Sequence, residues 1–347
     1  MEAAVHPEPR SRRRWALRVL TPTVALTVGA ILLLCVIGLE LTDSNEYIFL
    51  PDQAHPVAPL VSVAGSHPQT GPGGIYFVDV IVRKATMLEK LFGGLHSGST
   101  LVPADEVVPT GVSSSEENQV DVSEMQTSQQ VAAAVALRAL GKKVTTTANG
   151  ALVAEIEPGF PASSKLRLTD LITAIDGTPV RSPVDVTGVM SGRPIGTTFH
   201  FTVKRAGKTQ VVPITTVAAG KGSKRGVVGV ILEPDEQIHL PIRVSIDSHG
   251  VSGPSAGLAF ALDVMQSLGR NVDRGHKIAA TGEIALDGTV GPIGGIKQKT
   301  IGAREAGVDV FLVPKANAAT ARKYAHGLRI IPVKNFQQAL QDLATLP

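Results

Sequence analysis

A serine and a lysine, 44 residues apart in two glycine-rich motifs, have the residue types of a nucleophile and its base. Ser255 lies in GPSAG (253–257), and Lys299 ends GGIKQK (294–299). A serine hydroxyl is a poor nucleophile until a neighbouring group takes its proton, and a lysine amine can do so once burial lowers its pKa. Serine/lysine pairs are known variants of the serine triad, so this chemistry needs no histidine.

The residues after Ser255 predict a helix that positions the serine. The apolar pattern SAGLAFALDVMQSL begins at Ser255 and ends before Gly269. At a helix start, the unsatisfied backbone amides and the positive end of the helix dipole can hold the oxyanion of a tetrahedral intermediate. The alternative is that Ser255 is an ordinary N-cap, since serine is among the preferred residues there.

A second helix must carry the lysine. It opens at the glycine pair 294–295, runs through KQKTIGAREAG to Gly307, and precedes a strand at 308–314. Another strand, KIAA (277–280), ends at Thr281, whose hydroxyl could orient an amine. The alternative base is Lys297, which also fits a solvated charge at the helix entry.

The histidines offer a different base. His249 lies six residues before Ser255, and His276 could approach the serine in three dimensions. Both also fit loop or surface positions. No G-x-S-x-G pattern surrounds Ser255, because Pro254 and Ala256 flank it.

The residues from 226 to 347 resemble the proteolytic domain of Lon proteases. GPSAG, TGEIALDGTVGPIGGIKQK (281–299) and AGVDVFLVPKAN (306–317) appear in the order of that family. The resemblance implies an α+β proteolytic domain in which Ser255 is the nucleophile, Lys299 its base and Thr281 a hydrogen-bond partner of the amine. Lys299 is favoured over Lys297 because the family retains a lysine at the second position of the K-x-K pair. Ser252 departs from the family, which commonly has an acidic residue there.

Residues 125–217 resemble a PDZ domain, a small β-rich domain with two helices. The resemblance rests on ALV (151–153), GFPA (159–162), LTDLI (168–172) and IDG (175–177) in that order. It implies a module that adds an extended peptide to a sheet edge, and the loop expected to bind the peptide carboxylate is 146–150. The alternative is a domain that only spaces or dimerises the enzyme.

A membrane anchor is predicted at residues 19–39, a run of 21 residues without a charge. The basic tail 1–18 holds five Arg, which should keep it in the cytoplasm and place the rest of the chain outside. The alternative, a cleaved signal peptide, has a shorter apolar region and a small-residue cleavage site.

The region 44–124 is expected to combine a linker with the N-terminal strands of the protease region. Residues 44–74 are rich in Pro, Gly, Ser and His and predict the linker, 75–82 predict a strand, and 97–120 predict an exposed loop. A helix is expected at 129–140, ended by Gly141.

Composition excludes several function classes. The net charge of +3 equals that of the basic tail, and aromatic residues make up 4% of the chain, so nucleic-acid binding has no support. Cys35 is the one cysteine and lies within the predicted anchor, which leaves no internal disulfide. The nine histidines show no metal-ligand spacing, and GKT (207–209) lacks the upstream glycine of a nucleotide-binding loop.

Together these features predict a single-pass cell-membrane protein whose external part is an ATP-independent serine endopeptidase. Its expected substrates are unfolded or extended polypeptides, recruited by the PDZ domain and cleaved through an acyl-enzyme. No metal or cofactor is implied, and the oligomeric state stays open, a homo-oligomer included. The alternative is a non-proteolytic adaptor of the same fold on the membrane surface.

Overall fold

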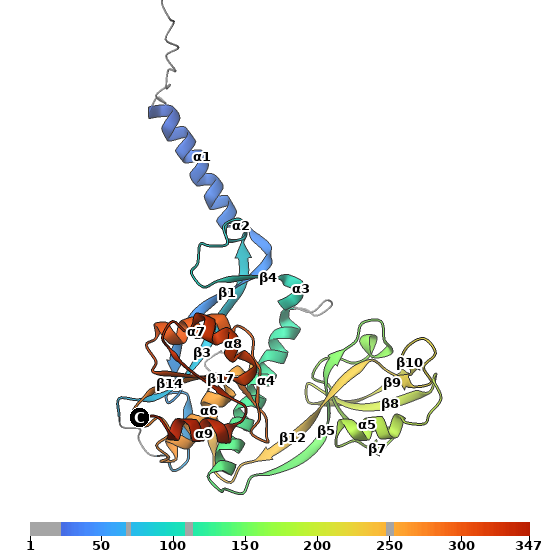
Figure 1. Ribbon diagram of the computed structural model, residues 1–347. Helices are drawn as coiled ribbons and strands as arrows, with labels where there is room; N and C mark the ends of the chain where they lie inside the picture. Colours follow the sequence, from blue (N-terminus) through green and yellow to red (C-terminus); the bar gives the residue numbers. More distant parts are fainter. Residues whose placement is uncertain (1–21, 67–70, 108–113, 248–252) are drawn as a thin grey trace, which may run out of the picture.

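A six-stranded mixed sheet, here called the core sheet, forms the larger globular part of the molecule (Figure 1). The computed structural model describes residues 22–66, 71–107, 114–247 and 253–347. Strands β14, β17 and β18 are parallel and β14 pairs in parallel with β3, whereas β1 is antiparallel to β3 and β4. In spatial order the strands are β18 (Arg329–Val333), β17 (Val310–Pro314), β14 (Lys277–Ala280), β3 (Gly74–Thr86), β1 (Asp43–Pro56) and β4 (Thr100–Pro103).

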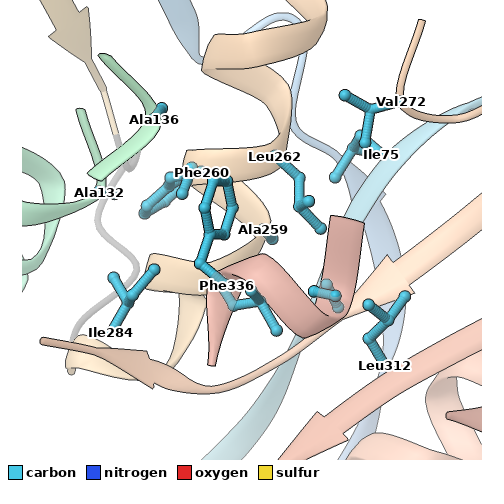
Figure 2. Packing of buried hydrophobic residues seen from close by; sticks show 14 of the residues in the cluster. Ile75, Ala132, Ala136, Ala259, Phe260, Leu262, Val272, Ile284, Leu312 and Phe336 are labelled. Atoms are coloured by element: carbon cyan, nitrogen blue, oxygen red, sulfur yellow. The ribbon is translucent and has the colours of Figure 1, made fainter. Parts of the chain in front are cut away.

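Helices cover both faces of the core sheet because its buried strands alternate their side chains between two apolar clusters. Ile278 and Ala280 of β14 pack with α4, α6 and α9, whereas Ala279 between them packs with α7 and α8. Figure 2 shows Phe260 of α6 packed near Phe336 of α9 in the first cluster. The helices are α4 (Ser114–Ala139), α6 (Gly257–Ser267), α7 (Ile296–Glu305), α8 (Ala318–Tyr324) and α9 (Phe336–Ala344).

The second sheet lies apart from the core sheet and has its own apolar cluster (Figure 1). Its spatial order is β12 (Val230–His239), β5 (Thr145–Ile156), β6 (Leu171–Ile175), β8 (Thr198–Arg205) and β9 (Lys208–Thr215), with β7 (Thr178–Pro179) paired to β6. Helix α5 (Pro183–Met190) packs on this sheet. The chain enters it along β5 and leaves along β12, and these two strands form an antiparallel ribbon toward the core.

The remaining elements are short, except for the N-terminal helix. Helix α1 (Pro22–Glu40) projects from the globular part and lies within the predicted anchor apart from its last residue (Figure 1). The short elements are α2 (Met87–Leu91), α3 (Ala104–Val107), β2 (Val61–Val63) paired with β13 (Val244–Ile246), β10 (Val217–Ala218) with β11 (Gly226–Val227), β15 (Glu283–Ile284) with β16 (Val290–Gly291), and 3-10 helices at Pro161–Ser164, Pro254–Ala256 and Lys315–Asn317.

The predicted α+β class is confirmed, but strands replace part of the linker predicted at 44–74. Residues 43–56 form β1, which pairs with β3 on one side and with β4 on the other. The prolines of β1 argue against a strand when the sequence is considered alone. In the structure the pairing with β4 ends at Phe49, before Pro51. Proline is tolerated where a strand needs no donor toward a neighbour.

The exposed loop predicted at 97–120 is also replaced in part by regular structure. Strand β4 and α3 occupy 100–107, and α4 begins at Ser114. The helix predicted at 129–140 is therefore the second half of α4. Because α4 packs on α6 beside the core sheet, residues 125–139 belong structurally with the core.

Candidate functional site

Ser255 lies in a tight turn that leads into α6. A 3-10 helix, Pro254–Ala256, precedes α6, and Gly253 before it has φ 84°, a left-handed conformation that favours glycine. A Cβ on Gly257 would lie 2.7 Å from Ser128 Oγ and 2.9 Å from a methyl of Ile284. The glycines of GPSAG thus serve backbone geometry and close packing, and they hold the partly exposed Ser255 at the start of the helix.

The structure brings Lys299 to Ser255. The Lys299 Nζ donates a hydrogen bond to Ser255 Oγ at 2.6 Å, and the lysine is only 4% exposed. Helices α6 and α7 lie on opposite faces of the core sheet, and the lysine side chain reaches the serine beside the end of β14. Gly295 lets α7 begin there, with φ 65° and no room for a Cβ beside Val80.

Burial lowers the pKa of the Lys299 amine to about 8, because removal from water disfavours the ammonium form. The negative charge of Asp79 opposes this effect and raises the lysine pKa. Burial raises the pKa of the Asp79 carboxyl in turn, while the lysine and a hydrogen bond from the Val80 amide lower it. The site therefore contains a buried amine with a weakened hold on its proton.

Asp79 was not among the residues selected from the sequence. It lies on β3, two residues beyond Phe77. Phe77 pairs with Ala280, the last residue of β14, so Asp79 lies beside the end of β14, close to the site. A signal was present, since Asp79 is the one acidic residue in the apolar run IYFVDVIV (75–82). An acidic side chain inside a buried strand calls for a partner.

Thr281 is fully buried between β14 and the serine turn, but its hydroxyl does not donate to the amine. It donates to the Ser255 carbonyl oxygen at 3.2 Å, and the Gly282 amide donates to the same oxygen at 2.8 Å. The Leu258 amide donates in return to the Gly282 oxygen. Thr281 in this structure fixes the backbone of the nucleophile turn, which corrects the predicted contact with Lys299.

Lys297 points elsewhere. Its Nζ donates to the Ser99 carbonyl oxygen at 2.7 Å and to Thr100 Oγ1 at 3.1 Å, and lies 5.7 Å from the centre of the Tyr324 ring. Ser255 is not among its partners in the described part of the chain. This position disfavours Lys297 as the base.

The histidine alternative gains no support from the structure. His276 precedes β14 at the end of the strand opposite Thr281, and its Nε2 contacts the Pro347 oxygen at 3.0 Å. His249 lies outside the described residues, as does Ser252. Among residues 253–347, the basic side chain that contacts Ser255 is therefore that of Lys299.

A groove of about 970 Å³ lies on the second sheet between α5 and β12. β12 is an edge strand of this sheet, so the side away from β5 has no neighbouring strand. Met190 and Val186 line the groove from α5, and three exposed cations lie at its margin: Arg193, Lys224 and Arg225. An apolar groove beside a free strand edge fits an extended peptide.

The carboxylate loop predicted at 146–150 is wrong. Residues 146–150 belong to the long strand β5, in which they pair with β12. The groove instead borders residues 225–230, which include β11 and Gly229; Gly229 has φ 83° and no space for a Cβ beside Phe160.

Comparison with known proteins identifies two domains. Residues 228–345 match the Lon protease (S16) C-terminal proteolytic domain, and residues 138–216 match the PDZ domain. The chain therefore contains a Lon-type proteolytic domain joined to a PDZ domain, as the resemblance predicted.

Two Lon proteases and one solved PDZ domain are among the proteins similar to this chain. Lon protease 2 of Bacillus subtilis is 28% identical over 181 residues, which cover 52% of this chain and 31% of the relative. Lon protease 1 of Myxococcus xanthus is 40% identical over 98 residues, covering 27% of this chain and 12% of the relative. The chain thus spans about a third or less of the length of these relatives. The PDZ domain of the SdrC-like protein from Listeria monocytogenes is 26% identical, with a TM-score of 0.23, and covers 24% of this chain and 87% of that one.

Proposed function

We propose that this chain, with its Lon-type proteolytic domain joined to a PDZ domain, is a membrane-anchored serine endopeptidase that cleaves unfolded or extended polypeptides without ATP. The observation that carries the proposal is the contact between Ser255 Oγ and the buried Nζ of Lys299. A nucleophile and a base within hydrogen-bond reach are the minimum that covalent acyl transfer requires.

In the proposed reaction the neutral amine of Lys299 takes the Ser255 proton as the oxygen attacks the scissile carbonyl. A pKa of about 8 leaves roughly a tenth of the amine neutral at pH 7, far more than an exposed lysine would have. The resulting ammonium then returns the proton to the leaving amine, and water hydrolyses the acyl-enzyme by the same route in reverse. Thr281 and Gly282 fix the serine turn during both steps.

The oxyanion is proposed to bind at the start of the nucleophile helix. The first backbone amides of a helix have no partner within it, and they point along the positive end of its dipole. We assign the Ser255 amide and a neighbouring backbone amide to this role, because Ser255 lies in the short 3-10 helix that opens α6. Fixed donors of this kind supply a large share of catalysis in acyl transfer.

Substrate recruitment is assigned to the groove between α5 and β12. An extended segment would add to the free edge of β12 and place side chains against Val186 and Met190. The cations at 193, 224 and 225 favour a peptide with a free carboxylate, since Glu157 is the one acidic residue that lines the groove.

Membrane anchorage is assigned to α1. Its residues 23–40 form an 18-residue window with mean hydropathy 2.3, none of which is buried against the rest of the molecule. An apolar helix whose side chains are exposed along its length suits a bilayer. The orientation proposed from the basic tail, with the catalytic part outside the cell, rests on residues 1–18, which lie outside the described residues.

Digestion of an unstructured protein by the detergent-solubilised full chain, without nucleotide, tests the proposal. Ser255→Ala and Lys299→Ala are each expected to abolish cleavage, whereas Lys297→Ala retains it. Lys297 is the matched control because it lies on the same helix and bonds elsewhere. Cleavage that survives in Ser255→Ala would contradict the mechanism. No cleavage by any properly folded form, wild type included, would instead favour the adaptor.

A further inference from the structure

The segment after β3 exposes large apolar side chains and buries a carboxylate, which is the reverse of an ordinary surface segment. Residues 87–96, here called the juxtamembrane loop, comprise α2 and the turn that follows it. Leu91, Phe92 and Leu95 are 60%, 58% and 53% exposed, whereas Glu89 among them is 2% exposed. Single exposed apolar residues need no explanation, but a group of them around a buried carboxylate does.

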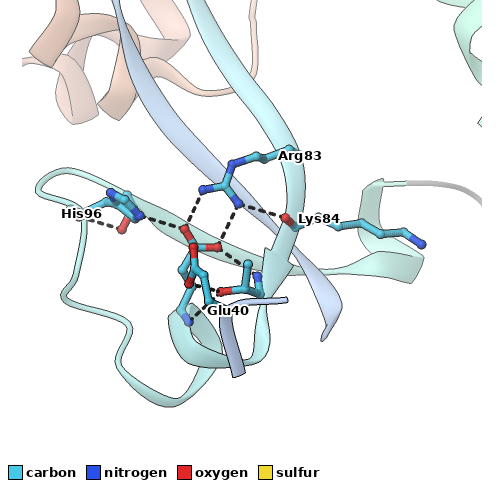
Figure 3. A network of polar contacts seen from close by, with 7 residues as sticks. Glu40, Arg83, Lys84 and His96 are labelled. Carbon is cyan, nitrogen blue, oxygen red and sulfur yellow. Dashed lines mark hydrogen bonds and ion pairs between the residues drawn. The ribbon is translucent and has the colours of Figure 1, made fainter. Parts of the chain in front are cut away.

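The buried Glu89 carboxylate contacts the side chains of Arg83 and His96, both of which reach the surface. Arg83 Nη2 lies 2.6 Å from Glu89 Oε1, and His96 Nε2 lies 2.7 Å from the same oxygen (Figure 3). The Arg83 guanidinium, with its paired hydrogen bonds, lowers the pKa of the Glu89 carboxyl to about 2. The network buries the Glu89 carboxylate beside two exposed basic side chains, and the three apolar side chains remain on the surface around it.

The loop is bound to the end of α1, which positions the apolar side chains beside the last turn of that helix. Thr86 Oγ1 donates to Glu40 Oε2 at 3.2 Å, and the Met87 amide donates to the Thr42 oxygen at 2.8 Å. Lys90 Nζ also donates to Asn45 Oδ1 at 2.6 Å. Leu41, the residue that follows α1, is 81% exposed.

Residues 98–100, which directly follow the juxtamembrane loop, are hydrogen-bonded to the helix that carries Lys299. Gln298 of α7 is buried, and its Nε2 donates to the Gly98 oxygen at 3.2 Å and to Thr100 Oγ1 at 2.8 Å. Lys297 donates to the Ser99 oxygen. The loop is therefore connected at both ends and does not hang from a flexible tether.

We propose that Leu41, Leu91, Phe92 and Leu95 form a second membrane contact, which inserts into the bilayer leaflet that α1 enters at Glu40. The inference rests on the proposed anchorage of α1. The occupant is lipid because this surface continues the wholly exposed apolar surface of α1 past its last turn. Leucine and phenylalanine side chains in the interfacial region bind a bilayer through buried apolar area. The contact fixes the tilt of the core sheet over the membrane, which a single helix cannot do.

Spin-label depth measurement on the full chain in phosphatidylcholine/phosphatidylglycerol vesicles tests this contact. Cys35→Ser gives a cysteine-free background, into which single cysteines are placed at positions 91, 92 and 95. Two reference positions calibrate the scale: Leu33→Cys in α1 for lipid, and Val211→Cys on the second sheet, which is 60% exposed, for water. The readout is the collision rate of each nitroxide with oxygen relative to a water-soluble nickel chelate.

The loop labels are expected to show a ratio of oxygen to nickel accessibility several times that of position 211 and closer to that of position 33. Labels at 91, 92 and 95 that match position 211, while position 33 reads lipid, would overturn the second contact and leave the anchor intact. Labels shielded from both reagents would overturn it in favour of a protein partner. A water-like reading at position 33 would overturn the anchorage itself, and the second contact with it.

Discussion

Lys297 and Lys299 lie two residues apart on α7 and contact opposite parts of the molecule. The amine of Lys297 reaches the Ser99 oxygen in the approach to β4, whereas the amine of Lys299 reaches Ser255 at the start of α6. Residues two apart on a helix project about 200° apart, so the two amines leave nearly opposite sides of α7. Lys297 is therefore a matched control for substitutions of Lys299.

Replacing Lys299 with Met is expected to stabilise the fold while abolishing hydrolysis. The folded-state pKa is lowered to about 8 from 10.5, so the unfolded chain binds more protons between these values and wild-type stability increases with pH across that window. Lys299→Met should therefore raise the free energy of unfolding by up to about 3 kcal/mol at pH 7, an advantage that shrinks as the pH approaches 10.5. Urea unfolding at both pH values measures it, with Lys297→Met as the control. A constant advantage across this range would contradict the assigned pKa shift.

We expect Asp79 to determine the pH at which hydrolysis begins, because its negative charge raises the pKa of Lys299. Hydrolysis requires the neutral amine, so kcat/KM should increase with pH up to about 8 and then level off. Asp79→Asn removes the negative charge that holds the lysine pKa up, and the rising limb should move to lower pH. Asp52→Asn is the matched control, since Asp52 acts on Asp79 and not on the lysine. The pH profile of peptide cleavage is the measurement, and a limb that stays in place in Asp79→Asn would refute this role.

Gly257 is required by packing around the nucleophile turn. Gly257→Ala would place a methyl within 3 Å of Ser128 Oγ and Ile284, and we expect a loss of about 1–3 kcal/mol together with reduced kcat. Gly294→Ala is the control because a Cβ there has nothing within 4 Å. Thermal unfolding and turnover of the two variants are compared. Equal effects in both would show that the close approach of α4 and α6 is unimportant.

The cations beside the α5/β12 groove should set affinity for peptide carboxylates. Arg225→Glu is expected to weaken binding of a peptide with a free carboxy terminus about tenfold, an effect that decreases as salt is added. Arg181→Glu makes the same charge change on the same domain outside the groove. Fluorescence anisotropy with free and amidated peptides measures both variants. If the amidated peptide loses as much affinity as the free one, the carboxylate is not what Arg225 recognises.

The parts of the fold that the sequence predicts well are those with local signals. The two helices that meet at the site are defined by local residues. These are the glycine that ends α6, the glycine pair before α7 and the apolar periodicity within the helices. The hairpin between β8 and β9 is also closed locally, by a two-residue turn in which Ala206 and Gly207 both adopt positive φ. In each case the residues that determine the structure are neighbours in the chain.

The features that the sequence does not reveal depend on distant partners. β1 is stabilised by pairing with β3 and β4 despite Pro51, and the sequence of the first half of α4 is too polar to show a helical apolar period. The direction of the Thr281 hydroxyl and the approach of Asp79 to Lys299 likewise follow from which strands lie side by side. Local periodicity carries no information on such placements.

The ribbon of β5 and β12 makes the second sheet a removable insert. Thr145 and His239 face each other at its base, so the chain leaves the core and returns to it at nearly the same place. A fragment that begins at residue 226 would lack β1, β3 and β4, half of the core sheet, whereas a short turn joining 145 to 239 would leave every core strand in place. For protein engineering, the PDZ domain is thus exchangeable as a cassette, and the N-terminal strands are not.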